Sequence, residues 1–409
     1  MDPCYKCRQR PAAGKKFRMC GGCQTALYCG DACQREDWSD HKLVCKIFSE
    51  ARDRGLAPLM LAAQSGNATM AARLLKAGAM VNKATERGVT ALIMAAQGGH
   101  AATVSILLQA GAKVNKATKI TPLQMAAQEG HVKVVIALIE AGATVADVRY
   151  DGFTALMIAA QQGHVKVVMV LIDAGATVDE VRSDGCTALM FAAQYGHKAA
   201  MLALIGSGAD VNAANKGAEW TALMMAAKDG HEACMEPLLQ AGSEIDWAGD
   251  NGCTALTLAA QGGHEGMLAV LLRAGANVHK TKNDGCTALL MAAEGGHVAA
   301  VKALLRAGAQ IDASTDLGGT PLSMAAQFGY TAVVELLLQA GAAVDKTIDY
   351  GCTALFYAAN NGRMAVVMAL IGAGANVSKV ANGGETSLLL AARNGHDGIV
   401  AALRRAGAV

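Results

Sequence analysis

The sequence has few aromatic residues, very little proline and sparse charge. Its 409 residues include 3 Trp, 7 Tyr, 6 Phe and 6 Pro, and Asp, Glu, Lys and Arg together make up 17%. Hydrophobic residues nevertheless reach 53%, which excludes a chain that is disordered throughout. Much of that share is alanine, and the 46 glycines far outnumber the prolines. This composition favours closely packed helices joined by short turns that end in glycine.

Long apolar runs and a secretory leader are also missing. No stretch approaches 18 uninterrupted apolar residues, and the start "MDPCYKC" has no basic segment followed by an apolar run. We therefore expect a soluble cytoplasmic or nuclear protein that is neither secreted nor bound to a membrane. In those reducing compartments, paired cysteines bind metal more often than they form disulfides.

Cysteine is concentrated at the N-terminus, where seven of the twelve cysteines fall within the first 45 residues. They form two Cys-x2-Cys pairs, one Cys-x3-Cys pair and one His-x3-Cys pair, a spacing in which one turn supplies two ligands to one zinc ion. Eight such ligands complete two tetrahedral sites and leave no open position, so the zinc would be structural rather than catalytic. Disulfides or a Cys-His nucleophile explain the seven cysteines and one histidine less well. The predicted ligands are Cys4, Cys7, Cys20, Cys23, Cys29, Cys33, His41 and Cys45.

This N-terminal segment resembles the MYND zinc finger, whose hallmarks are visible in "YCGDACQREDWSDHKLVC". The resemblance covers residues 4–45, although the twelve-residue loop after Cys7 is slightly long for the family. It implies an interleaved arrangement, and a RING finger is disfavoured because its terminal Cys-x2-Cys is absent. The first ion would be held by Cys4, Cys7, Cys29 and Cys33, and the second by Cys20, Cys23, His41 and Cys45.

The MYND resemblance also implies a binding function. Fingers of this family bind proteins, and some hold a short proline-containing peptide in a groove that Gln34 and Trp38 would flank here. The alternative for Trp38 is packing against the helix that follows the finger. A second alternative comes from the basic loop "KCRQRPAAGKKFR": residues 1–55 carry eleven basic and seven acidic residues, net +4, and the remainder carries 25 and 27, net −2. Such a loop is usually solvated. Because clustered basic residues can also bind phosphates, a nucleic-acid-associated transcriptional regulator stays the alternative function.

From about residue 56 the chain repeats itself with a period of 33, interrupted by one spacing of 31 and one of 34. In one unit, "DGFTALMIAAQQGHVKVVMVLIDAGATVDEV", we expect Thr154 to cap a first helix that ends near Gly163, and a second helix to start at His164. Stacked units of this length predict a solenoid. The eleven units are marked by Ala57, Thr90, Thr121, Thr154, Thr187, Thr221, Thr254, Thr287, Thr320, Thr353 and Thr386.

These units resemble ankyrin repeats, whose pattern of "D-x-x-G-x-T-P-L-x-x-A-A", "G-H" and "G-A-x-V-N" or "V-D" appears in nearly every unit, with "TPL" mostly replaced by "TAL". The resemblance implies a mostly α-helical ankyrin-repeat solenoid of about eleven helix-turn-helix units in residues 56–409, after a finger domain in residues 1–55. The family's histidine after the "TPL" leucine is replaced throughout, from which we expect slightly looser helix caps. The 31-residue unit, "NKATKITPL", also lacks the Asp-Gly turn.

Histidine and cysteine also recur at fixed positions in the repeats. Neighbouring units lie roughly 10 Å apart, too far for consecutive imidazoles to share an ion or for consecutive cysteines to form a disulfide. We interpret the histidines as structural, bonding backbone between units, and the cysteines as small apolar fillers. The histidines are His100, His131, His164, His197, His231, His264, His297 and His396; the cysteines are Cys186, Cys234, Cys253, Cys286 and Cys352.

The ankyrin resemblance implies that partners bind along the concave face formed by turn tips and first helices. That face would carry the methionines after "TAL", the aromatic residues Tyr195, Trp220, Phe328 and Tyr350, and a glutamine ladder. Aromatic side chains are common binding anchors, whereas repeat duplication alone could have copied the glutamines. The ladder consists of Gln64, Gln97, Gln128, Gln161, Gln194, Gln261 and Gln327.

The two resemblances together predict a zinc-binding interaction adaptor or scaffold. Its finger would bind a short peptide and its repeats a second protein, and linking two modules lets one chain bridge two partners. We do not expect an enzyme, because the chain has no glycine-rich phosphate loop and no room for the SET domain that accompanies some MYND fingers.

Overall fold

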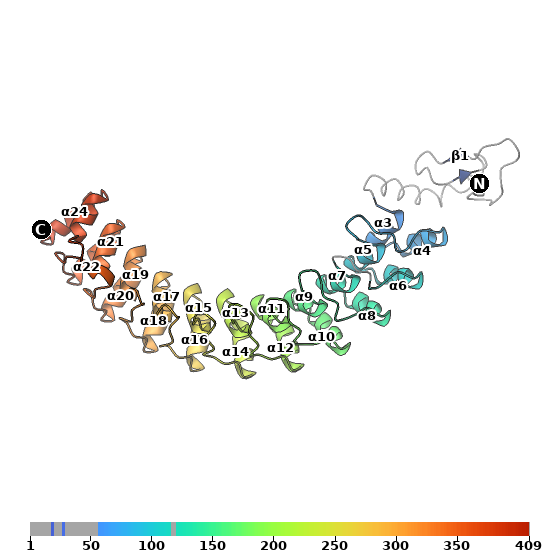
Figure 1. Cartoon of the computed structure of the whole chain (residues 1–409), viewed down its shortest axis with the longest axis horizontal. Helices are drawn as coiled ribbons and strands as arrows, with labels where there is room; N and C mark the ends of the chain where they lie inside the picture. Colours follow the sequence, from blue (N-terminus) through green and yellow to red (C-terminus); the bar gives the residue numbers. More distant parts are fainter. Residues whose placement is uncertain (1–17, 20–26, 29–55, 116–119, 409) are drawn as a thin grey trace. The chain divides into compact units, whose positions relative to one another are not determined.

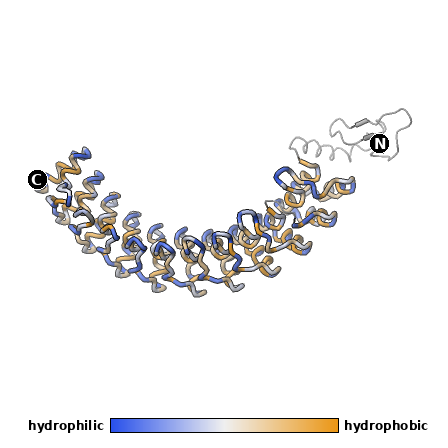
Figure 2. Tube along the Cα trace, viewed as in Figure 1, coloured by the Kyte–Doolittle hydropathy of each residue, from blue (hydrophilic) through white to orange (hydrophobic). Residues whose placement is uncertain are grey.

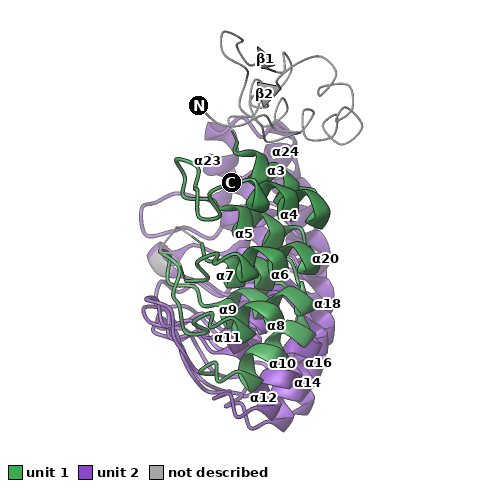
Figure 3. Cartoon of the chain, turned by 90° about the vertical axis from the view of Figure 1, so that its right-hand side faces the viewer, with its two compact units in different colours: residues 1–178 green, residues 179–409 purple. Residues whose placement is uncertain are grey.

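The computed structural model describes residues 18–19, 27–28, 56–115 and 120–408, and these residues are mostly helical (Figure 1). Their contacts divide the chain into two compact units, residues 1–178 and 179–409 (Figure 3). This division falls inside the repeat array and does not test the predicted boundary at residues 55 and 56. No described helix is both long and apolar enough to cross a membrane.

The described residues of unit 1 form a short two-stranded hairpin and four helix pairs. Strands β1 (Arg18–Met19) and β2 (Leu27–Tyr28) pair antiparallel. In each repeat a short first helix is followed by a longer second helix, and the two kinds of helix stack in separate layers. The helices are α3 (Pro58–Gln64), α4 (Ala68–Lys76), α5 (Ala91–Gln97), α6 (Ala101–Gln109), α7 (Pro122–Gln128), α8 (Val132–Glu140), α9 (Ala155–Gln161) and α10 (Val165–Asp173).

Unit 2 continues the pattern with seven helix pairs and one turn of 3₁₀ helix, η1 (Asp349–Gly351). The eleven pairs of the described chain confirm the predicted helical solenoid. The helices are α11 (Ala188–Gln194), α12 (Lys198–Gly206), α13 (Ala222–Asp229), α14 (Glu232–Gln240), α15 (Ala255–Gly262), α16 (Glu265–Arg273), α17 (Ala288–Glu294), α18 (Val298–Arg306), α19 (Pro321–Phe328), α20 (Thr331–Gln339), α21 (Ala354–Asn360), α22 (Met364–Gly372), α23 (Ser387–Arg393) and α24 (Asp397–Arg405).

The first helices begin where the sequence predicts, because threonine caps them. The hydroxyl of Thr154 accepts a 3.2 Å hydrogen bond from the backbone N–H of Met157, and the same bond forms in eight other repeats. The expectation of looser caps is wrong where the replacement is itself polar. Gln124, Thr257 and Ser323 each accept a bond from the cap residue's own N–H and complete a capping box. The region around the missing Asp-Gly turn, residues 116–119, lies outside the described residues.

The core consists of small aliphatic side chains, as the composition indicates. In one repeat Ala159 and Ala160 of α9 and Val167 and Leu171 of α10 are fully buried. Hydrophobic residues run along the helices in both units (Figure 2). The methionines directly after "TAL" belong to this core and not to the binding face, so their predicted exposure is wrong. These residues, Met157, Met190 and Met224, are each 1% exposed.

Candidate protein-interaction site

The predicted finger residues lie outside the described part of the chain. What the structure describes there is the hairpin, in which Arg18 pairs with Tyr28 and Met19 with Leu27. By sequence, Cys20 and Cys23 belong to the connection between the two strands and Cys29 follows the second. Seven thiols and one imidazole are a donor set that suits zinc. The undescribed positions are Cys4, Cys7, Cys20, Cys23, Cys29, Cys33, His41 and Cys45 of the ligand set, and Gln34 and Trp38 of the proposed peptide groove.

The repeated histidines connect neighbouring repeats. His131 Nε2 lies 2.9 Å from the backbone oxygen of Gln97, and five other histidines make the equivalent contact at 3.0 to 3.2 Å. Because a carbonyl oxygen only accepts, Nε2 carries the proton and donates it. The structural interpretation is confirmed for His100, His131, His164, His264, His297 and His396. Arg363 replaces histidine in one repeat, and its Nε donates to the oxygen of Gln327 at 3.2 Å.

The ladder residues contribute their backbone, not their side chains, to these contacts. The carbonyl of Lys228 accepts the bond from His264, and that of Asn360 accepts it from His396, just as glutamine carbonyls do elsewhere. The ladder side chains are exposed or half-buried in every repeat. A glutamine side chain is therefore not required for this bond between repeats.

The four predicted aromatic residues lie in four different repeats. Tyr195 and Phe328 are exposed at the ends of α11 and α19, and Phe328 packs 6.2 Å from the ring of Tyr330. Tyr350 is exposed in η1. Trp220 precedes the cap of α13, is half-buried, and has the Nζ of Lys228 5.0 Å from its ring centroid. The structure thus distributes these residues over several repeats and does not gather them into one cluster.

Ion pairs at the turn tips were missed by the sequence reasoning. Arg182 pairs with Asp184, its Nε lying 2.8 Å from Oδ1, and this hydrogen bond is the main cause that lowers the pKa of Asp184 to about 2. Arg149 and Asp151 form the same pair at the tip in unit 1. A basic residue two positions before the Asp of an Asp-Gly turn was the available signal.

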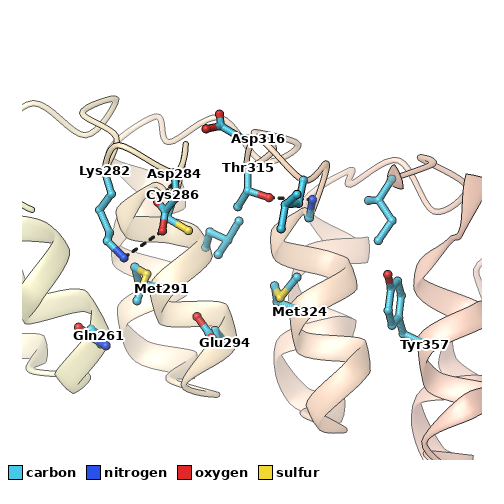
Figure 4. A pocket seen from close by; sticks show the side chains of 14 residues that line it. Gln261, Lys282, Asp284, Cys286, Met291, Glu294, Thr315, Asp316, Met324 and Tyr357 are labelled. Atoms are coloured by element: carbon cyan, nitrogen blue, oxygen red, sulfur yellow. Dashed lines mark hydrogen bonds and ion pairs between the residues drawn. The ribbon is translucent and has the colours of Figure 1, made fainter. Parts of the chain in front are cut away.

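A cavity of about 540 Å³ opens in unit 2 between the turn tips and the first helices (Figure 4). We call it the Met291 groove. Its lining comes from four consecutive repeats, and the sequence reasoning did not identify it. Its charged residues are Lys282, Asp284, Glu294 and Asp316; its apolar residues are Leu290, Met291, Leu317, Met324 and Ile348; and Gln261, Cys286, Thr315, Gly319 and Tyr357 complete it.

The cysteines of the repeats divide into two groups. Cys186, Cys234 and Cys253 are buried, which confirms them as small fillers. Cys286 and Cys352 are half-buried, so that interpretation is incomplete for them. Burial raises the pKa of Cys286 to about 12, and Asp284 adds to this shift through a hydrogen bond and through its negative charge. The thiol in the Met291 groove is therefore protonated at neutral pH.

The stacked helix pairs, threonine caps and contacts between repeats define an ankyrin-repeat solenoid. The model for ankyrin repeats matches residues 31–118, 59–149, 123–215, 189–282, 266–348 and 341–408, so the chain belongs to the ankyrin-repeat family. The model for the MYND finger matches residues 4–45. Modules of both kinds generally mediate protein–protein interactions, and MYND fingers bind zinc.

A solved structure gives the same fold. The chain is similar to the crystal structure of the human ASB11 ankyrin repeat domain, with 27% identity and a TM-score of 0.51. The match covers 54% of this chain and 99% of that one.

Proposed function

We propose that the chain is a zinc-binding adaptor that holds two proteins at once. Its finger, stabilised by two structural zinc ions, takes a short proline-containing peptide beside Gln34 and Trp38, and its repeats take a second protein on the face of turn tips and first helices. The main observation in support is that backbone carbonyls, and not side chains, accept the hydrogen bonds that the histidines donate between repeats. The bonds between repeats therefore do not use the ladder side chains, and Tyr195, Phe328 and Tyr350 are exposed where a partner can reach them.

We propose binding without catalysis. The six histidines with described contacts each spend Nε2 on a backbone carbonyl, and burial raises the pKa of the thiols of Cys186 and Cys286 to about 11 and about 12. The imidazoles are thus used to hold neighbouring repeats together, and the thiols stay protonated at neutral pH. Both observations support a scaffold better than acid–base or nucleophilic chemistry.

The finger half of the proposal is tested with the zinc-loaded full chain and a library of proline-containing peptides. Duplex DNA and RNA serve as parallel ligands. We expect peptide binding that the Trp38→Ala variant loses. Trp247→Ala is the matched control, since Trp247 lies in the repeats and donates its Nε1–H to the carbonyl of Glu219 in the preceding turn tip.

Two results would contradict this half. Peptide binding that survives Trp38→Ala would place the peptide elsewhere. Nucleic-acid binding that falls steeply with salt and is unchanged by Trp38→Ala would favour the nucleic-acid-associated regulator, because phosphate contacts release counterions.

A further inference from the structure

Two neighbouring turn tips carry a large apolar or aromatic residue at a position where three other repeats have aspartate, namely Asp151, Asp184 and Asp284. Asp284, three positions before the cap Thr287, accepts a 3.0 Å bond from the backbone N–H of Cys286 and pairs with Lys282 at 3.2 Å. Leu317 and Tyr350 occupy the same position before their own cap threonines. Neither side chain has an oxygen that can replace the carboxylate in both contacts. They are instead 76% and 78% exposed.

Tyr350 also holds a strained backbone. Its φ of 62° lies in the left-handed region, which costs a residue other than glycine on the order of 1–2 kcal/mol. The bond from Asn382 N–H to the Tyr350 carbonyl, 2.7 Å, does not explain this conformation. Asp284 accepts the equivalent bond from Asp316 at 3.0 Å and does not have a positive φ. The strain therefore presents an exposed aromatic ring that the stacking of repeats does not require.

Leu317 lines the Met291 groove, and Tyr350 belongs to the next tip along the chain. Beneath the tips, Met291 and Ile348 are almost fully buried and Met324 is half-buried. Methionine side chains adapt to varied apolar shapes. A volume of about 540 Å³ with such a floor accommodates large apolar side chains of a peptide.

The charges of the groove have one predominant sign. It has three carboxylates, Asp284, Glu294 and Asp316, against the single ammonium of Lys282, which gives a formal charge of −2. Lys282 is already paired with Asp284. The remaining two carboxylates face the same groove, so a basic residue of a partner is favoured there and an acidic one is opposed.

We propose that the Met291 groove binds an extended segment of a partner protein in which a large apolar residue stands next to lysine or arginine. The apolar side chain enters between Leu317 and the floor of Met291, Met324 and Ile348. The basic side chain meets one of the two carboxylates, Asp316 at the turn tip or Glu294 at the end of α17. Tyr350 covers the segment from the next tip. This specificity rests on the proposed function of the repeats as a protein-binding surface.

The test screens the full chain against a displayed library of random dodecapeptides. We expect enrichment of sequences with a large apolar residue within three positions of lysine or arginine. Leu317→Asp should weaken their binding at least tenfold and leave the fold intact, because aspartate occupies the equivalent position in three other repeats. Glu294→Gln with Asp316→Asn should weaken it similarly and reduce its salt dependence. The control is Glu335→Gln, on the exposed face of the second helix α20.

Tyr350→Gly adds a readout that a purely structural role would not give. It relieves the left-handed strain, so the midpoint of thermal unfolding should rise or stay unchanged while peptide binding falls. If the variant lowers the midpoint of thermal unfolding as well as peptide binding, Tyr350 is a structural residue and its part in the proposal is overturned.

The remaining outcomes separate this inference from the proposed function. Enrichment of acidic sequences, or of peptides that Leu317→Asp and the double carboxylate variant still bind, overturns the groove while leaving the repeats a binding surface. Enrichment only of peptides that Trp38→Ala loses overturns the groove and confines peptide binding to the finger. No enrichment at all overturns both proposals.

Discussion

The imidazole Nε2 of His131 lies 2.9 Å from the backbone oxygen of Gln97, in the preceding repeat. The partner is an atom that every residue type carries. A donor side chain is thus needed for this bond, supplied by histidine here and by Arg363 in another repeat, whereas a glutamine side chain is not needed at the other position. The side chain of His131 therefore holds neighbouring repeats together, whereas the side chain of Gln97 takes no part in this bond.

The first prediction compares these two residues. His131→Ala should lower the free energy of unfolding by about 1–2 kcal/mol, because the Gln97 carbonyl loses its donor. Gln97→Ala, at an exposed position, should change it by less than about 0.5 kcal/mol. Urea unfolding followed by circular dichroism, with hydrogen exchange of α5 and α7, measures both. Equal losses would show that the glutamine side chain has a structural role after all.

The second prediction concerns the glycine beneath that histidine. Gly99 has a φ of 70°, and a Cβ there would lie 2.6 Å from His131 Nδ1. Gly111, with a φ of 82°, has nothing within 4 Å of such a Cβ and is the matched control. Both alanine variants incur the left-handed penalty of about 1–2 kcal/mol, but only Gly99→Ala also displaces the imidazole, at a further ~1–3 kcal/mol. Thermal and urea unfolding should rank the variants in that order, and a reversed order would contradict the packing described here.

Much of the solenoid was predictable from sequence because it rests on local chemistry repeated many times. Thr154 caps its helix through its own hydroxyl, and the histidines were correctly assigned to backbone bonds between repeats, because neighbouring units are too far apart for the imidazoles to share an ion. The methionines after "TAL" were misplaced because an apolar residue at one helical position suits a binding face or a core equally well. Which it joins depends on the angle between stacked helices.

The Met291 groove could not be predicted for a related reason. Its residues come from four repeats, and the cavity depends on how deeply Met291 and Met324 lie beneath the tips. Leu317 was visible as a departure from the Asp-Gly pattern, but its exposure was not. The finger ligands rest on their spacing and on the match of residues 4–45 to the MYND finger, and they stay a prediction because they lie outside the described residues.

The third prediction uses two helix caps that differ in one bond. Thr320 accepts a 3.2 Å bond from Ser323 N–H, whereas the side chain of Thr353 makes no cap bond to α21. Thr320→Ala should therefore cost about 0.5–2 kcal/mol, and Thr353→Ala clearly less. Both threonines are buried, so loss of the methyl group affects them similarly. Hydrogen exchange of α19 and α21 reports each helix separately, and equal effects would show that the cap bond contributes little.

The fourth prediction concerns thiol reactivity in the Met291 groove. The pKa of Cys286, raised to about 12 by burial and by Asp284, keeps its thiolate scarce at pH 8. Alkylation by iodoacetamide, read by peptide mass spectrometry, should be at least tenfold slower than for an unstructured thiol, because the thiolate is the nucleophile. Asp284→Asn should speed it by removing an acceptor and a negative charge.

Asp184→Asn is the matched control for that variant, because Asp184 stands beside Cys186 in another repeat. It should leave the Cys286 rate unchanged. The sign of the pH dependence of stability follows from the raised pKa of Cys286. Below the pKa of about 9 that this thiol has in the unfolded chain, its contribution to the free energy of folding is fully present. As pH rises from about 9 to about 12, the unfolded chain loses the proton more readily than the folded one, and this contribution is lost. A Cys286 rate equal to that of a free thiol at pH 8 would contradict the raised pKa.

The last prediction is the effect of metal removal on the full chain. The eight-ligand set of residues 4–45 predicts two zinc ions per chain, and metal analysis of the purified protein should find two. Chelation should abolish peptide binding at the finger, because a segment this short depends on its metal to fold. The helical circular-dichroism signal should change little, since the described residues contain no group of three or more His, Cys, Asp or Glu able to hold a metal ion. Cys20→Ala should lower the zinc content while Cys286→Ala, in the repeats, leaves it at two. A content of one ion, or a large loss of helix on chelation, would contradict the separation of a metal-dependent finger from a metal-independent solenoid.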